Sequence, residues 1–298
     1  FLCFSMKILI LGSEGFVGHN LVEGLSKNHE IFCADLIENS VHKNYKQFDI
    51  TDLSSVEKIV KDVDVVIDLA AHSLVSSLDG SIENAKVNII GLLNVLESCR
   101  KNGIKKIIFT SASSMIGIPN SEQVSENHSA FPKTAYGITK LASEHYLRLY
   151  QELYGINYVV FRFFNIYGTY QKNGLIPTLY SRISKNQPLT VFGKGDQIRD
   201  YVFIQDIIQF FEKATSENIS DNKIFNMGTG KGTSILDIIK IISKTMNITP
   251  EIEYKEPRPG EIGNFVSDPN LLLSTFGRIP STTVEEGIKQ TIDWLKSN

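Results

Sequence analysis

Short apolar segments alternate with amphipathic segments along the first half of the chain. The apolar segments are rich in β-branched side chains and predict strands at Lys7–Leu11, Glu30–Ala34, Val63–Leu69, Ile104–Phe109 and Tyr158–Phe163. The segments between them repeat their apolar residues at helical spacing and predict helices at Gly15–Ser26, Ser54–Lys61, Ile82–Asn102 and Tyr136–Tyr154. Strands that alternate with helices predict a parallel sheet, and uniformly apolar strands indicate a sheet covered on both faces.

The pattern changes after about Tyr167. Glycine and proline become frequent, the segments shorten, and helices are predicted only at Gln205–Thr215, Ser234–Met246 and Val284–Lys296. We therefore predict an α/β protein in two parts. A doubly wound parallel sheet of the Rossmann type spans residues 6–167, and a smaller C-terminal α/β lobe spans residues 168–298, with some segments returning to the first part.

Composition narrows the class of protein. The 298 residues suffice for a full core, and a net charge of −3 without a basic block gives no case for nucleic acid. The three cysteines fit no metal or disulfide spacing, so we expect reduced thiols in a cytoplasmic protein and no metal. No apolar run approaches the roughly 18–20 residues of a membrane span. The FLCFS ahead of Met6 is too short for a signal peptide, and we expect residues 1–5 to lie outside the fold.

Three glycines follow the first predicted strand at three-residue spacing. Gly12, Gly15 and Gly18 lie in LGSEGFVG, between that strand and a predicted helix. Glycine lets the backbone approach a pyrophosphate closely, and the helix N-terminus offers N–H donors and a partial positive charge. The position of the motif favours dinucleotide binding over a plain strand–helix turn. Glu14 is an acid in a loop suited to an anion, and we expect its side chain to point to solvent.

Acidic residues end the next two apolar patches. Asp35 closes the second predicted strand, 17 residues after Gly18, where a carboxylate can take the two ribose hydroxyls of an adenosine. No arginine lies nearby to accept a 2′-phosphate, so NAD is favoured over NADP. Asp49, with Ile50, follows the third patch and would place a carboxylate near the adenine amino group.

A tyrosine and a lysine are four residues apart in YGITK. On a helix Tyr136 and Lys140 share a face. A free tyrosine has a pKa near 10, but an adjacent ammonium and a nicotinium charge would favour its phenolate. Such a pair can take a proton from a substrate alcohol while hydride leaves the same carbon.

With these motifs, the chain resembles the extended short-chain dehydrogenases/reductases of the nucleotide-sugar epimerase/dehydratase group, and among them the UDP-glucose 4-epimerases. The resemblance runs from Met6 through essentially the whole chain. Its further landmarks are LAA at 69–71, NIIGLLNVLE at 88–97, FRFFNIYG at 161–168, FGKGDQIRDYVFIQD at 192–206 and RPGEI at 258–262.

The resemblance implies binding roles for particular residues. The NAD-binding residues would be Gly12, Gly15, Phe16, Val17, Gly18, Asp35, Asp49, Ile50, Leu69, Ala70, Ala71, Asn88, Tyr136, Lys140 and Phe164. The residues for a nucleotide-diphosphate sugar would be Asn165, Leu175, Val191, Phe192, Arg199 and Arg258. Two arginines on the diphosphate also make physical sense, because a guanidinium offers forked donors to phosphate oxygens.

The stretch FTSASSMIG departs from the family pattern. The family places a catalytic Ser or Thr at a position that falls on Ala112 when Met115–Gly117 is aligned without a gap. A bulge or a one-residue gap would bring Ser113 or Ser111 into place, and we favour Ser113 because the strand is expected to end there. Dehydratases carry Asp-Glu directly after the catalytic hydroxyl, whereas Ser113 and Ser114 follow Ala112 here. Elimination needs such an additional acid or base, so the sequence disfavours it.

We therefore expect an NAD-dependent isomerase, a UDP-hexose 4-epimerase that oxidises C4 transiently, interconverting UDP-glucose and UDP-galactose. One alternative is a nucleotide-sugar reductase or dehydrogenase that releases its product after one hydride transfer. Another is a catalytically weak NAD-binding relative, which the alanine at position 112 suggests. A cytoplasmic homodimer is expected, with the helices at 82–102 and 136–154 forming its interface, and no membrane partner.

Overall fold

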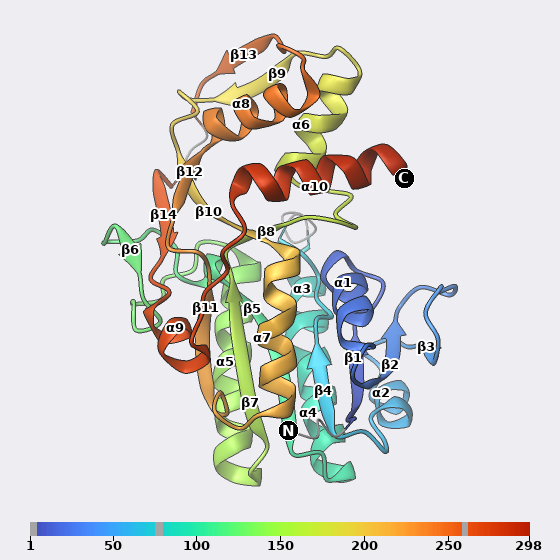
Figure 1. Cartoon of the computed structure of the whole chain (residues 1–298). Helices are drawn as coiled ribbons and strands as arrows, with labels where there is room; N and C mark the ends of the chain where they lie inside the picture. The colour runs from blue at the N-terminus through green and yellow to red at the C-terminus, as the bar shows by residue number, and fades with distance from the viewer. Residues whose placement is uncertain (1–4, 75–79, 258–261) are drawn as a thin grey trace. The chain divides into compact units, whose positions relative to one another are not determined.

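The computed structural model describes residues 5–74, 80–257 and 262–298 and divides them into two compact units (Figure 1). Unit 1 contains the described residues up to Gly117 together with Asn127–Phe163 and Ile208–Phe225. Unit 2 contains Ile118–Glu126, Phe164–Ile207 and the described residues from Asn226 onward. The chain thus crosses from one unit to the other several times, and each unit is built from segments distant in sequence.

Unit 1 is organised around a seven-stranded sheet with the order β11-β7-β5-β4-β1-β2-β3. The strands are β1 (Lys7–Leu11), β2 (Glu30–Asp35), β3 (Tyr45–Gln47), β4 (Val65–Asp68), β5 (Lys106–Ala112), β7 (Asn157–Phe163) and β11 (Lys223–Met227). The pairs from β3 through β7 are all parallel. The chain builds outward from β1 to β3 and then returns to place β4 on the other side of β1. Ligands of such sheets bind at the carboxyl ends of the strands beside this reversal.

Alternate strand residues belong to different faces of the sheet. Leu9 and Leu11 join a buried cluster with side chains from the helices α2 (Leu53–Ile59), α4 (Leu92–Asn102) and α5 (Ala135–Tyr154). The helices α1 (Phe16–Leu25) and α7 (Ile204–Ser216) touch each other, because a Cβ on Gly24 would lie 2.5 Å from Ile208. The strands are therefore apolar on both faces, and the predicted doubly wound parallel sheet is confirmed.

The helix predicted over Ile82–Asn102 is divided into three parts. It begins as α3 (Ser81–Ala85), passes through a π-helical turn (Lys86–Gly91) and continues as α4 to Asn102. A π turn holds one more residue than an α turn and is frequent near functional sites. Helical spacing in the sequence does not reveal this insertion, because apolar residues continue through it.

Unit 2 combines a small sheet with a separate strand pair. The sheet has the order β12-β10-β14-β6, with β8 also paired to β10, while β13 pairs with β9. Its strands are β6 (Gln123–Val124), β8 (Asn165–Tyr167), β10 (Ile198–Phe203), β12 (Gly232–Ser234) and β14 (Asn264–Ser267), and the pair is β9 (Leu189–Phe192) with β13 (Ile252–Lys255). Its helices are α6 (Leu175–Ser184), α8 (Ile235–Met246), α9 (Asn270–Phe276) and α10 (Val284–Ser297).

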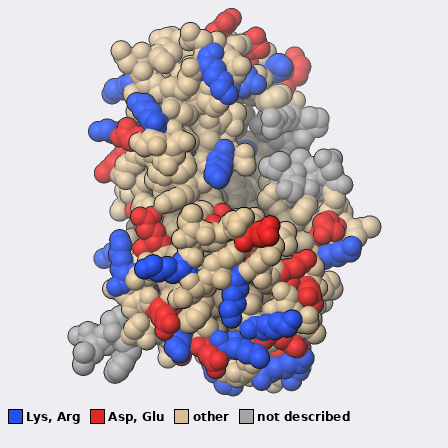
Figure 2. Space-filling view, turned by 90° about the vertical axis from the view of Figure 1, so that its right-hand side faces the viewer, with Lys and Arg blue, Asp and Glu red and all other residues tan. Residues whose placement is uncertain are grey.

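Surface charge is mixed. On the face shown in Figure 2, lysines and arginines are interspersed with aspartates and glutamates, in keeping with the net charge of −3. Among the residues described, no helix combines the length and apolar character that crossing a bilayer requires.

Candidate functional site

The glycine loop between β1 and α1 is packed as closely as dinucleotide binding requires. Gly12 has a φ of +81°, and a Cβ there would lie 3.0 Å from the backbone of Ala70. A Cβ on Gly18 would lie 2.3 Å from the carbonyl oxygen of Gly12, so only glycine allows α1 to begin against the loop. Gly15 is the N-cap of α1 and offers no capping side chain. The N–H groups of the first turn of α1 are therefore placed to receive a phosphate.

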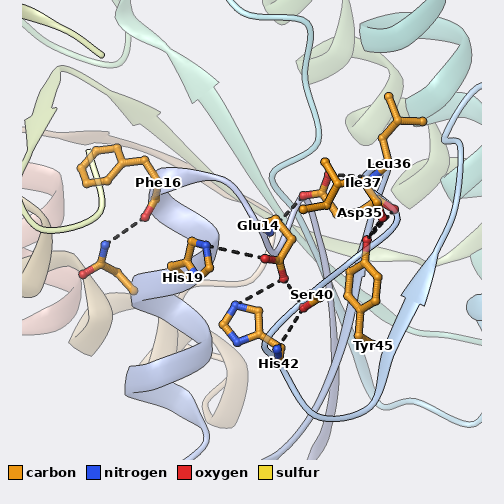
Figure 3. A network of polar contacts seen from close by, with 10 residues as sticks. Glu14, Phe16, His19, Asp35, Leu36, Ile37, Ser40, His42 and Tyr45 are labelled. Atoms are coloured by element: carbon orange, nitrogen blue, oxygen red, sulfur yellow. Dashed lines mark hydrogen bonds and ion pairs between the residues drawn. The ribbon is translucent and has the colours of Figure 1, made fainter. Parts of the chain in front are cut away.

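Asp35 lies at the carboxyl end of β2, next to this loop (Figure 3). Its two carboxylate oxygens accept hydrogen bonds from the backbone N–H groups of Glu14 (2.9 Å) and Leu36 (2.7 Å). These contacts fix the carboxylate where the sequence predicts contact with an adenosine ribose. Glu14 does not point to solvent as expected, because its side chain is only 8% exposed and lies between His19 and His42.

Asp49 and Ile50 follow β3 in different environments. Asp49 is exposed, and its Oδ1 accepts bonds from the N–H and hydroxyl of Thr51. Ile50 is buried and packs against Gly91, where a Cβ would lie 2.8 Å from its side chain. Asp49 is thus held in a local turn. The side chain of Ile50 packs against the end of the π turn that precedes α4.

The loop after β4 is held in place from two sides. Ala70 donates its N–H to Oδ1 of Asp68, and Leu69 donates to the carbonyl of Leu11 in β1. Asn88, in the π turn, accepts from the N–H of His72 at 2.8 Å and donates to the hydroxyl of Thr139 at 3.0 Å. Leu69 and Ala70 therefore border the glycine loop, Ala71 follows them in the same loop, and Asn88 joins this loop to α5.

Tyr136 and Lys140 lie in the first two turns of α5. The hydroxyl of Thr134 caps this helix by accepting the N–H of Gly137 at 3.0 Å. Lys140 is buried, and its Nζ donates to the carbonyl of Thr110 in β5 at 2.8 Å. That Nζ lies 5.6 Å from the centre of the Tyr136 ring. The predicted pair therefore shares one face of the helix, directed at the end of β5.

Burial changes the pKa values of these groups. Loss of hydration raises the pKa of Tyr136 to about 12 and lowers the pKa of Lys140 to about 8. The pKa of the Asp68 carboxyl rises to about 6, mainly through burial, with Lys140 opposing the rise. Oδ2 of Asp68 is buried and accepts no hydrogen bond from the described residues. Asp68 is a buried acid close to the pair, and the only sign of it in the sequence is its place at the end of the apolar run VVID.

Lys140→Met should change how stability depends on pH. The pKa of Lys140 is lowered from 10.5 to about 8 on folding, so between these values the unfolded chain binds more protons than the folded one. The lysine's contribution to the free energy of unfolding therefore rises with pH in that window, and methionine removes this rise. Urea unfolding followed by far-UV circular dichroism at pH 7.5, 8.5 and 9.5 measures the effect. The exposed Lys61→Met is the control, and parallel curves for wild type and Lys140→Met would contradict the prediction.

The strand register of β5 decides whether Ser111 can supply the hydroxyl that Ala112 lacks. Thr110, Ser111 and Ala112 pair in unbroken parallel register with Phe161, Arg162 and Phe163 of β7. No bulge shifts a serine onto the face of Ala112, so the hydroxyl of Ser111 points to the opposite face. Ser111 is buried, and its hydroxyl has no hydrogen-bond partner among the described residues.

Ser113 begins a 3₁₀ turn that ends at Met115. This turn packs on the first turn of α5, because a Cβ on Gly137 would lie 2.7 Å from the carbonyl oxygen of Ser114. Ser113 therefore leaves the strand one residue before the contact with Gly137, and alternation between the two faces of the sheet no longer applies to it.

Unit 2 brings three of the predicted substrate residues together. Leu175 at the start of α6 and Val191 and Phe192 of β9 line one pocket of about 430 Å³. Thr178, Arg182 and Gln197 line the same pocket, so its wall has both apolar and hydrogen-bonding groups. The volume is within the range of small-molecule sites, roughly 300–1,000 Å³.

Two further predicted substrate residues of unit 2, Asn165 and Arg199, lie on β8 and β10. Asn165 is exposed on β8, and the preceding Phe164 is buried, stacked on Phe265 with ring centres 5.2 Å apart. Arg199 on β10 donates to the carbonyls of Ile198 (2.8 Å) and Gly263 (3.0 Å). Arg258 lies outside the described residues.

Asp200, beside Arg199, was not singled out by sequence reasoning. Its buried carboxylate accepts from the backbone N–H groups of Thr229, Gly230 and Ser267 and from the hydroxyls of Thr229 and Ser267. One acid thereby joins β10, β14 and the loop before β12. The feature of the sequence that could have identified Asp200 is its position between Arg199 and the apolar residues of β10.

A parallel sheet with a glycine loop, a carboxylate at the end of β2 and a Tyr–Lys pair defines a dinucleotide-binding protein of the dehydrogenase/reductase type. Residues 8–228 match the NAD dependent epimerase/dehydratase family. A putative UDP-glucose 4-epimerase of Methanocaldococcus jannaschii is 35% identical over 305 residues, covering 98% of this chain and 99% of that protein. The chain belongs to the NAD-dependent epimerase/dehydratase family.

Solved structures agree with this assignment. The UDP-glucose 4-epimerase of Thermotoga maritima with UDP-glucose matches at a TM-score of 0.91 and 31% identity, covering 98% of this chain and 99% of that one. The UDP-glucose 4-epimerase of Thermus thermophilus complexed with NAD matches at 0.88 and 30%, with the same coverage. The predictions of an extended short-chain dehydrogenase/reductase fold, an NAD cofactor and a nucleotide-sugar epimerase are confirmed.

Proposed function

We propose that the protein is a UDP-hexose 4-epimerase that works by transient oxidation at C4 of the sugar. The observation that carries the proposal is the Tyr136–Lys140 pair beside the end of β5, where Ser113 and Ser114 stand instead of the acids that elimination needs. The names of the relatives from M. jannaschii, T. maritima and T. thermophilus support the same activity.

Apart from Phe164, the residues proposed to bind NAD all belong to unit 1. Bound NAD would supply a hydride acceptor that returns the hydride to the opposite face of the sugar. The glycine loop would hold the pyrophosphate, Asp35 the adenosine ribose, and Lys140 the nicotinamide ribose. Lys140 has three N–H donors and uses one on Thr110, so it retains donors for the ribose.

Tyr136 would accept the proton of the C4 hydroxyl at its phenolic oxygen and return it after the sugar has turned over. Burial alone raises the pKa of Tyr136 to about 12, so the phenolate needs nearby positive charge at neutral pH. The ammonium of Lys140 is the cation that α5 provides on the same face. The pair therefore has to work as a unit, with Lys140 favouring the phenolate form of Tyr136.

Unit 2 is proposed to bind the nucleotide diphosphate. The 430 Å³ pocket lined by Leu175, Val191 and Phe192 would hold the uracil base between apolar walls. Arg199, Asn165 and Arg258 would bind the two phosphates. A firmly held diphosphate would let the 4-keto sugar present either face without leaving the protein.

The activity is tested with purified protein and no added cofactor. UDP-glucose, UDP-galactose and their N-acetyl and uronic-acid counterparts are supplied separately, and the sugar products are separated by chromatography. Interconversion of C4 epimers is expected for at least one pair. Turnover only with added NADH would favour a reductase, and no turnover by protein with bound NAD would overturn the proposal in favour of a binding protein.

Ser113→Ala should slow epimerisation by about 10²–10³-fold, the usual effect of removing one hydrogen bond to a developing charge. Ser113 is proposed as the hydroxyl that replaces Ala112, because the 3₁₀ turn at Ser113 frees it from the register of β5. Ser111→Ala is the matched control, since Ser111 points to the face opposite Ala112. Equal losses in kcat for both variants, or loss in Ser111→Ala alone, would contradict the assignment.

A cytoplasmic homodimer is also proposed. Apolar side chains are exposed on the helices at 81–102 and 135–154, namely Ile82, Ile90, Ile138, Leu149 and Leu153. Pairing of these helices with a second copy would cover them. The buried free thiols Cys33 and Cys99 are compatible with a reducing compartment. Analytical sedimentation tests the dimer by comparing molecular masses. The wild type should sediment as a dimer, and the Leu149→Glu/Leu153→Glu variant as a monomer.

A further inference from the structure

The glycine loop carries an acid that the proposed function does not use. Glu14 lies between two histidines, His19 of α1 and His42 in the segment after β2 (Figure 3). Nε2 of His19 is 3.7 Å from Oε2 of Glu14, and Nε2 of His42 is 3.5 Å from Oε1. Each imidazole therefore faces a different oxygen of the same carboxylate, at a distance longer than an ordinary hydrogen bond.

The three side chains are largely sheltered from water. Their exposed fractions are 8% for Glu14, 13% for His42 and 20% for His19. Nε2 of His42 is buried and has no hydrogen-bond partner among the described residues. A buried imidazole nitrogen without a partner is costly unless another group binds it. The position of this nitrogen, directed at a carboxylate oxygen, suggests that a cation belongs between them.

We propose that Glu14, His19 and His42 form a binding site for Zn²⁺ or a similar divalent transition metal. Two imidazole nitrogens and one carboxylate oxygen are a ligand set that suits zinc, with water as the fourth ligand. The three ligand atoms lie within 4.8 Å of one another. Bonds of about 2.0–2.2 Å around a tetrahedral ion place ligand atoms roughly 3.3 Å apart, so side-chain rotations have to close the remaining gap.

Neighbouring groups already orient the acid. The hydroxyl of Ser40 donates to Oε1 of Glu14 and accepts the backbone N–H of His42 at 2.9 Å. Ser40 therefore joins one ligand to the backbone of another, as the outer hydrogen bonds of metal sites do. The imidazole rings of His19 and His42 lie 4.7 Å apart, which brings α1 and the segment after β2 to one point.

A metal at this point would connect two segments beside the proposed cofactor site. The backbone N–H of Glu14 donates to Asp35, so fixing Glu14 also fixes the carboxylate proposed to bind the adenosine ribose. A divalent ion would further convert the negative charge of Glu14 into a net positive one. Only this consequence for NAD rests on the proposed function; the metal site itself does not.

Cobalt titration of tag-free protein, stripped of metal with a chelator that is then removed by gel filtration, tests the proposal. We expect one equivalent of Co²⁺ to bind with the visible absorption of four-coordinate cobalt and to be displaced by Zn²⁺. Glu14→Gln and His42→Gln should each weaken the binding by about tenfold or more, since loss of one ligand removes a third of the protein's donors. The exposed His145→Gln, on α5, is the matched control and should bind as the wild type does.

Further measurements distinguish a metal site from an ordinary cluster of side chains. Far-UV circular dichroism in chelator shows whether each variant is folded, and zinc should raise the melting temperature of the wild type and of His145→Gln but not of Glu14→Gln. Absence of stoichiometric binding, or equal binding by all the variants, would overturn the metal site and leave an ordinary histidine–glutamate cluster. Binding is measured without substrate, so a failure here leaves the proposed epimerase activity untouched.

Discussion

Tyr136→Phe is expected to reduce epimerase turnover by about 10²–10⁴-fold, because it removes the group that would take the proton of the sugar hydroxyl. The ring remains to pack at the start of α5, so the fold should persist. The loss should appear in kcat rather than KM, since the phenolic oxygen is needed for the proton transfer. Initial rates with a UDP-hexose found to be a substrate, measured from pH 6 to 9, give the result.

Two controls define what the loss means. Tyr146→Phe removes a phenolic hydroxyl from the same helix and should retain the activity of the wild type. NAD content, measured after release from the denatured protein, should be equal in the two variants. More than one-tenth of the wild-type activity in Tyr136→Phe would show that another residue moves the proton.

Arg162→Met is expected to lower the free energy of unfolding by about 3–5 kcal/mol. Arg162 of β7 and Glu144 of α5 form a two-pronged ion pair, with Nε to Oε1 at 2.9 Å and a terminal nitrogen to Oε2 at 2.7 Å. Their side chains are only 5% and 2% exposed. Methionine would leave a buried carboxylate without its partner, which is costly because the charge has little access to water.

Urea unfolding measures this cost, and a second pair calibrates it. Arg100→Met breaks the pair with Glu97 on the surface of α4, where side chains are 40% and 31% exposed, and should cost about 0–1 kcal/mol. The double change Glu144→Leu/Arg162→Met removes both buried charges and should recover much of the loss. A similar small cost for both single changes would show that the buried pair contributes little to stability.

Local sequence patterns were sufficient for five of the seven strands of the first sheet, whereas its two edge strands, β3 and β11, were not among the predicted strands. Strands covered on both faces are apolar throughout, and β1 was located to its exact ends, Lys7 and Leu11. Helix α6 was missed because Gly174 and Pro177 suggested a loop. Proline at the third position of a helix loses no hydrogen bond, since the first-turn N–H groups have no partner within the helix.

Site residues were easier to identify where they form motifs than where distant segments meet. The glycine loop and the Tyr136–Lys140 pair are short-range patterns, and their local geometry agrees with the motif. The burial of Glu14 could not be read from its neighbours, because His42 reaches it from beyond β2. The environment of Asp68 could not be read from nearby residues either, because it depends on Lys140, 72 positions further along the chain.

The π turn at Lys86–Gly91 makes chain length matter more than side-chain identity in this segment. Asn84 before the turn accepts the hydroxyl of Thr139 at 2.9 Å, and Asn88 within it donates to the same hydroxyl at 3.0 Å. Deleting one residue would restore regular α-helix and turn α3 by about 100° relative to α4. Asn84 would then swing away from Thr139. Substitutions within the turn at positions other than Asn88 leave this geometry available, whereas a single deletion removes it.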